Sequence, residues 1–217
     1  MSEFYDEVDE EVRREQLKRL WDRYSIFIIA IAVLIIAGVG GWRGYQYAEG
    51  KKAAEAGSAF NKAIELSEQN KREEAEKAFA EVAATAPAGY RMLARFHQAA
   101  EAAGRDKAAA VKLYDELAAD RSIGAEQQSM ARLRAAGLLV DTAPYPDLKQ
   151  RLEGEAASGA PFRHAARELL ALSVWKANDA AAARQWLDMI ALDGETPPGL
   201  RSRAEALQAL LPAVAKS

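Results

Sequence analysis

Each of the two histidines in the chain has a glutamate one helical turn away, which is the spacing of a simple acid–base pair. His97 precedes Glu101 and His164 precedes Glu168, so each pair shares one face if its segment is helical. Neither pair is accompanied in the sequence by a nucleophilic serine or cysteine, a glycine-rich phosphate loop or a cluster of metal ligands. We therefore interpret both pairs as exposed helix contacts, and we expect no enzymatic activity, no catalytic residue, no metal and no cofactor.

Four arginines form a second pattern, in two pairs that repeat along the chain. They are Arg91 and Arg95 in the first pair and Arg163 and Arg167 in the second. Each pair follows an aromatic residue, and its members lie one helical turn apart. Guanidinium groups on one face can bind carboxylates or backbone carbonyls in bidentate fashion. We predict that these arginines line a groove that binds an extended polypeptide or a partner's terminus; solvated arginines paired with nearby glutamates are the alternative.

The charge balance restricts the kind of partner. The chain of 217 residues has 29 basic and 32 acidic side chains, a net charge of −3. A protein that binds nucleic acid through its charge carries a positive excess. We expect protein partners, with no nucleic acid and no small-molecule substrate.

An uncharged apolar stretch near the N-terminus is the clearest single element. Residues 24–42 carry no charge, and a helix of that length covers about 28 Å, close to the hydrocarbon thickness of a bilayer. Trp21 and Tyr24 lie at one end and Trp42 and Tyr45 at the other, as in the aromatic belts of membrane helices. A buried core helix and a cleaved signal peptide are the alternatives. The run is longer than the roughly 7–15 residues of a signal-peptide core, so we predict a retained transmembrane anchor.

The flanks of this stretch predict its orientation. Residues 1–23 contain five lysines and arginines, and the nineteen residues after residue 42 contain three; the flank richer in positive charge usually stays in the cytoplasm. We expect a single-pass membrane protein with a cytoplasmic tail at 1–23, an anchor at 24–42 and a domain at 49–217 across the membrane, which is the periplasm if the source is a Gram-negative cell. The anchor also has a face of small residues that suits close packing against another membrane helix. This face consists of Ala30, Ala37, Gly41 and Gly44.

The rest of the sequence predicts helices only. Helix-forming residues dominate, and all seven prolines follow residue 86, at positions where they separate helices. We expect helix pairs at about 49–69 and 71–85, 89–103 and 106–119, 124–140 and 145–156, and 161–177 and 179–191, with a last helix at 197–214.

Small and aromatic residues recur through these pairs with a nearly constant period. The matches are Ala75-x3-Phe79 followed by Pro87, Tyr90-x2-Leu93-Ala94-x2-His97, Ala110-x3-Tyr114 and Ala182-x3-Trp186. They resemble the tetratricopeptide repeat, which has W-x2-L-G-x2-Y in its first helix, A-x3-F and then P in its second, and a period of about 34 residues. An irregular alanine-rich helical domain is the alternative, and residues 124–156 match poorly. We predict an all-α fold: a single N-terminal transmembrane helix followed by a tetratricopeptide-like solenoid of helical hairpins.

The order of these elements resembles the ancillary SecYEG translocon subunit family, the YfgM-like proteins. The resemblance rests on a short charged N-terminus, one anchor that ends in the aromatic and basic run at 41–47, and tetratricopeptide-like helices to the C-terminus. It implies an inner-membrane protein with a periplasmic repeat domain that associates with the Sec translocon and with periplasmic chaperones and has no enzymatic activity.

Taken together, these patterns predict a membrane-tethered adaptor for protein–protein interaction, and the resemblance implies that it links protein export to periplasmic chaperones. Three alternatives remain open. One is a scaffold for envelope or outer-membrane assembly, and another is an organelle-surface repeat receptor with its domain in the cytosol. The third and weakest is a hydrolytic enzyme that uses His164.

Overall fold

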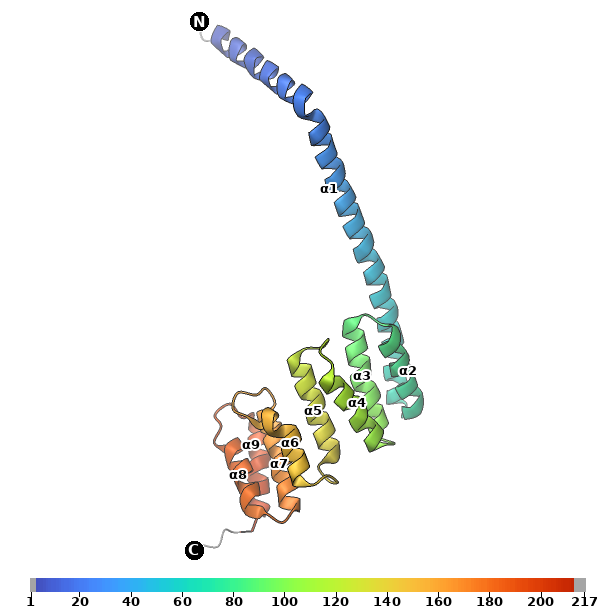
Figure 1. The fold of residues 1–217 in the computed structure, drawn as a ribbon, viewed down its shortest axis with the longest axis vertical. Helices are drawn as coiled ribbons and strands as arrows, with labels where there is room; N and C mark the ends of the chain where they lie inside the picture. The colour runs from blue at the N-terminus through green and yellow to red at the C-terminus, as the bar shows by residue number, and fades with distance from the viewer. Residues whose placement is uncertain (1–2, 213–217) are drawn as a thin grey trace. The chain divides into compact units, whose positions relative to one another are not determined.

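The protein is all-α throughout the residues that the structure, a computed structural model, describes, namely 3–212 (Figure 1). Contacts along the chain divide it into two units, Met1–Ala54 and Glu55–Ser217. The elements are α1 (Glu3–Glu68), α2 (Arg72–Thr85), α3 (Ala88–Ala103), α4 (Lys107–Ala119), α5 (Ala125–Leu139), α6 (Tyr145–Ala156), α7 (Arg163–Lys176), α8 (Ala180–Ala191) and α9 (Pro198–Leu210). The predicted fold class is confirmed.

The first helix, α1, is continuous, although the sequence predicted an anchor and a separate helix from about residue 49. The segment between them, 43–48, has no proline and only one glycine, Gly44. A single glycine inside a helix costs about 1 kcal/mol, so nothing there ends the helix. From Trp21 onward, α1 contains an 18-residue window with a mean hydropathy of 2.5, none of it buried. It is therefore long and apolar enough to cross a membrane.

The end of α1 and the helices α2–α8 form four hairpins, and α9 follows the last of them (Figure 1). Side chains in two of the turns cap the helix that follows. The Asp106 carboxylate accepts hydrogen bonds from two backbone N–H groups at the start of α4, and Asp179 does the same for one at the start of α8. In the first and fourth hairpins the turn is made by an asparagine with positive φ, Asn70 or Asn178, a conformation that asparagine tolerates better than most residues.

Each second helix buries residues at the same three positions, spaced by four and then three residues. These sets are Ala75, Phe79 and Val82 in α2; Ala110, Tyr114 and Leu117 in α4; Leu148, Leu152 and Glu155 in α6; and Ala183, Leu187 and Ile190 in α8. The first two sets contain the predicted small and aromatic pairs. In α8 the predicted pair, Ala182 and Trp186, is only partly buried, so that alignment was one residue out. In α6, leucine takes the place of alanine, which explains the poor match of 124–156.

The core is a row of four hydrophobic clusters rather than one centre. Each cluster combines a hairpin with the first helix of the next: α1, α2 and α3 in one, then α3, α4 and α5, then α5, α6 and α7, and finally α7, α8 and α9. Stability in such a stack comes largely from contacts between neighbours. The last helix, α9, buries Ala204 against the final hairpin and closes the row.

Candidate protein-binding groove

The arginines on the first helices bind the ends of the second helices. Arg167 in α7 donates from Nε to the carbonyl of Ala156, the last residue of α6, at 3.0 Å. Arg201 in α9 donates to the carbonyl of Ala191, the last residue of α8, at 2.8 Å. In the same way Arg91 binds the residue that caps α2, with a distance of 3.2 Å. A cation at this place satisfies carbonyls that lack a helical partner and interacts favourably with the helix dipole.

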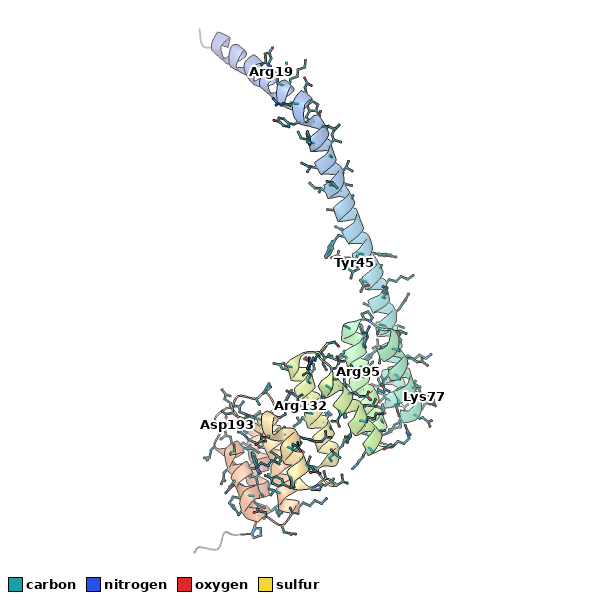
Figure 2. The ribbon with its side chains drawn as sticks, viewed as in Figure 1. Arg19, Tyr45, Lys77, Arg95, Arg132 and Asp193 are labelled. Atoms are coloured by element: carbon teal, nitrogen blue, oxygen red, sulfur yellow. The ribbon has the colours of Figure 1, made fainter. Side chains whose placement is uncertain are left out.

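Three of the arginines occupy equivalent positions, directly after a fully buried alanine of a first helix, and each pairs with an acidic residue near the end of its hairpin. The pairs are Arg95 with Asp120, Arg132 with Glu155, and Arg167 with Asp193. Figure 2 labels Arg95, Arg132 and Asp193 on three successive hairpins. The repeated ion pair therefore ties the first helix of a hairpin to the end of its second helix.

Asp193 is the centre of the densest of these networks. Its carboxylate accepts hydrogen bonds from Arg163 Nε at 2.8 Å and from Arg167 Nη1 at 3.2 Å, and His164 Nε2 lies 3.1 Å from the same oxygen. The geometry at His164 is outside that of a hydrogen bond, so we regard this contact as close packing. The Arg163 guanidinium holds the pKa of Asp193 well below its usual range. The Glu195 carboxylate also accepts a hydrogen bond from Arg163 Nη2, at 2.5 Å.

These contacts locate the four arginines that the sequence singled out. The structure brings Arg163 and Arg167 together at Asp193, but it holds Arg91 and Arg95 separately, at the ends of α2 and α4. The side chain of Arg167 is only 5% exposed and that of Arg163 only 12%. Arg167 is therefore buried and Arg163 nearly buried, and a role of the four arginines in partner binding remains a prediction. Only Arg91 is exposed.

The two histidine–glutamate pairs do not form acid–base sites. Glu168 binds Arg203 of α9, and Glu101 accepts a hydrogen bond from Ser67. His97 instead stacks on the ring of Phe79, with 4.9 Å between ring centroids. Burial lowers the pKa of His97, and the nearby Glu101 opposes this shift. His97 is thus a packed aromatic residue rather than a proton donor.

An apolar groove with a volume of about 480 Å³ lies between α3 and α5 and is open to solvent. Its walls are formed by Met92, Leu93, Phe96, His97 and Ala100 of α3 and by Glu126, Gln127, Met130 and Arg134 of α5, with Tyr114 of α4 and Phe162 completing it. We call this surface the α3/α5 groove. Leu93 remains 44% exposed, although a residue of its kind normally loses most of its surface in a folded domain. Exposed apolar surface gathered in a hollow is typical of a binding site.

Two charges stand at the ends of the α5 wall. Glu126 is in the first turn of α5 and Arg134 is eight residues later, and both are exposed. Eight residues of helix cover about 12 Å. Among the described residues neither forms an ion pair, in contrast to Arg132 on the same helix. Burial raises the pKa of the Tyr114 hydroxyl, and the charge of Arg134 opposes this shift.

The sequence reasoning missed this groove, although a signal was present. Apolar residues on α3 include Leu93, Met92 and Phe96 in addition to the buried Ala94 and Ala99. Around the axis of α3, these apolar residues cover a wider arc than packing against helices on one side requires. Only the fold shows that α5 runs beside this surplus face.

The predicted small-residue face of the anchor lies on α1. Its four residues, Ala30, Ala37, Gly41 and Gly44, are exposed, and a methyl group added at either glycine would meet no atom within 4 Å. Counted at about 100° per residue, they fall within about 60° of one another around the helix. The face is thus open for contact with another helix.

Comparison with known proteins gives one match. Residues 18–186 match the family described as a tetratricopeptide repeat-like domain, a match that begins within α1 and ends within α8. No curated protein and no solved structure matches the chain. Repeat domains of this kind are typically interaction modules without catalytic activity.

Proposed function

Because the chain belongs to the tetratricopeptide repeat-like domain family, we propose that it is a membrane-tethered adaptor whose α3/α5 groove binds proteins. The observation that carries the proposal is the groove itself: an apolar hollow of about 480 Å³ on a stack of helical hairpins. A chain that also has a helix able to cross a membrane would hold this groove beside the bilayer.

For the topology we propose a cytoplasmic tail at 1–23, a transmembrane anchor at 24–42 and a periplasmic domain at 49–217 of an inner-membrane protein. The excess of positive charge before the anchor supports this orientation. Within the membrane, the face formed by Ala30, Ala37, Gly41 and Gly44 packs against another helix. A photo-crosslinker in place of Ala37 would label that neighbour, and the same group at the exposed Val39, on the opposite side of the helix, is the control.

We assign the adaptor to the exit of the Sec translocon, where it links protein export to periplasmic chaperones. The support is the resemblance in element order to the ancillary translocon subunits. Tethering favours this role because it confines the groove near emerging chains, which raises its effective concentration there. In this role the protein performs no catalysis, since His97 is packed against Phe79 and Glu168 is paired with Arg203.

Of the four arginines, Arg91 is the one that can contribute to partner binding directly, since it is exposed and makes a single hydrogen bond. Arg95, Arg163 and Arg167 affect partner binding only indirectly, because they hold the helices of the hairpins together. Replacing Arg91 by glutamate should therefore weaken capture modestly and leave folding intact, whereas replacing Arg167 should damage the domain itself.

The test is crosslinking in native membranes from the groove. A photoreactive amino acid in place of Leu93 should capture translocon subunits, exported chains or periplasmic chaperones, identified by mass spectrometry. The matched control is Lys112, an exposed residue on α4. Capture of outer-membrane assembly factors alone would favour an envelope scaffold, and equal yields at Leu93 and Lys112 would contradict binding in the groove.

A further inference from the structure

The α3/α5 groove has walls that select one form of ligand, and this inference rests on the proposed protein-binding function. We propose that it accepts a two-turn amphipathic helix of a partner, with large apolar side chains three or four residues apart. In that helix an acidic residue comes first, before the apolar pair. A basic residue lies about seven positions after the acidic residue.

The apolar part of this ligand follows from the lining. Met92, Leu93, Phe96, Met130 and Phe162 contribute two thioethers, one aliphatic group and two aromatic rings. Methionine adapts its shape to different neighbours, so such a surface takes large apolar side chains without requiring one particular residue. A cavity of about 480 Å³ is larger than a single side chain fills, and two neighbouring anchors of one helix face suit it.

The helical form follows from what the walls lack. An extended peptide exposes backbone N–H and C=O groups at every residue, and burying them without partners costs free energy. Among the described lining residues, polar groups come only from Tyr114, His97, Glu126, Gln127 and Arg134, too few to pair with every backbone group of an extended peptide. A helix satisfies its own backbone hydrogen bonds, so it can enter an apolar groove at little cost. The dimensions agree, because Met92 and Ala100, like Glu126 and Arg134, are eight positions apart, about 12 Å or roughly two helical turns.

The direction of the bound helix follows from the charges. Glu126 attracts a basic side chain at one end of the groove, and Arg134 attracts an acidic one at the other. A helix is itself stabilised by acidic residues in its first turn and basic residues in its last. Both requirements are met when the partner helix runs antiparallel to α5. Positions seven apart lie on the same side of a helix, about 10 Å from each other, which matches the spacing of the two charges on α5.

The arginines near the groove argue against recognition of a C-terminal carboxylate. A groove built to hold a C-terminal carboxylate would present several unpaired cations together, but the nearby Arg95 is paired with Asp120 and Arg132 with Glu155. Within the part of the chain that the structure describes, Arg134 is the one cation that lines the groove, and a single cation at its end can pair with one acidic side chain. The groove therefore reads apolar side chains and the order of two charges, not a chain terminus.

Binding can be measured with the full chain in lipid nanodiscs and fluorescein-labelled 18-residue peptides in an alanine and glutamine host. The first peptide has glutamate, two leucines four residues apart and lysine in the proposed order. The second has the same composition with glutamate and lysine exchanged. The third replaces both leucines by alanine, and the fourth has a central proline that breaks the helix. Fluorescence anisotropy gives the Kd of each peptide. The Met130→Asp variant in identical nanodiscs is the control for binding of the peptides to lipid.

We expect the first peptide to bind tightest. Loss of both leucines should weaken binding at least about tenfold, and the proline should weaken it by a similar factor. Exchange of the charges should weaken binding about three- to tenfold. Because the exchange also lowers the helicity of the peptide itself, a rescue variant is needed: the double substitution Glu126→Lys with Arg134→Glu should reverse the preference between the first two peptides.

Each contrary result is informative. Equal binding of the proline peptide would overturn the helical form, and a preference that the double substitution does not reverse would overturn the direction. If no peptide binds while Leu93 still crosslinks to proteins in membranes, the groove binds proteins but not amphipathic helices. If Leu93 crosslinks no better than Lys112, the proposed function itself is wrong.

Discussion

Arg167 offers the strongest test of the idea that the arginines hold the hairpins together. The variant Arg167→Met keeps a long side chain in place and removes the charge and the hydrogen bonds. In the structure Arg167 donates to the carbonyls of Ala156 and Met189, at 3.0 and 3.1 Å, and to the Asp193 carboxylate at 3.2 Å. The variant therefore leaves two carbonyls and one carboxylate oxygen short of a donor.

The size of the effect can be estimated from these contacts. An unsatisfied buried acceptor costs about 1–3 kcal/mol, and breaking a buried ion pair from one side costs about 3–5 kcal/mol. Asp193 retains two hydrogen bonds from Arg163, which reduces the second figure. We expect a loss of about 3 kcal/mol in the local free energy of unfolding, roughly a hundredfold in the opening equilibrium. Arg91→Met is the control; it removes one partly buried hydrogen bond of an exposed side chain and should cost about 1 kcal/mol.

Hydrogen exchange measured by mass spectrometry on the full chain in nanodiscs resolves both variants by segment. Protection of the amides in α7 and α8 should fall about a hundredfold in Arg167→Met, while α2 and α3 remain protected because the stack transmits stability mainly between neighbours. In Arg91→Met the change should be small everywhere. Equal protection of α7 in the two variants would refute the structural role of Arg167.

Three further predictions concern the core, acid and a close contact. Phe79→Ala removes a fully buried ring and should cost about 3–5 kcal/mol, measured by urea unfolding of the full chain. Hydrogen bonds from Ser122 hold the pKa of Asp120 at about 2, against 3.8 ordinarily; the stabilisation is therefore complete above pH 4 and is lost as the pH falls towards about 2. Asp120→Asn should flatten that part of the stability profile, and an unchanged profile would contradict it. A Cβ at Gly57 would lie 2.8 Å from Tyr90 Oη. The overpacking costs about 1–3 kcal/mol, of which alanine regains about 1 kcal/mol in helix propensity, so Gly57→Ala should destabilise by less than about 2 kcal/mol, and adding Tyr90→Phe should recover the loss in thermal melts.

Most of the fold could be predicted from the sequence because characteristic residues lie at the ends of its helices. Prolines and turn residues such as Asn70 and Asn178 separate the helices, and each predicted pair appears in the structure within a few residues. The break expected after residue 42 failed because one glycine does not end a helix. The fourth repeat was aligned one residue out because Ala182 and Ala183 are both small, and only packing distinguishes them.

The candidate site was less predictable, since it depends on which helices become neighbours. Arginines repeating one turn apart fit a ligand-binding face and a capping role equally well on paper. Their partners, Asp120 and Asp193, lie about 25 residues further along the chain, and only the hairpin geometry brings them close. The α3/α5 groove likewise requires Leu93 and Met130 to face each other across two helices, a relation that local sequence does not contain.

The most direct test of the account compares crosslinking yields from Leu93 in native membranes for three chains that differ elsewhere. In the otherwise unaltered chain the groove should capture its partner. Met130→Asp, which places a charge in the apolar wall, should reduce the yield by at least about tenfold, while Arg91→Glu should reduce it by less than about threefold. The opposite order, with capture lost in Arg91→Glu and kept in Met130→Asp, would show that the arginine face binds the partner and that the apolar groove does not.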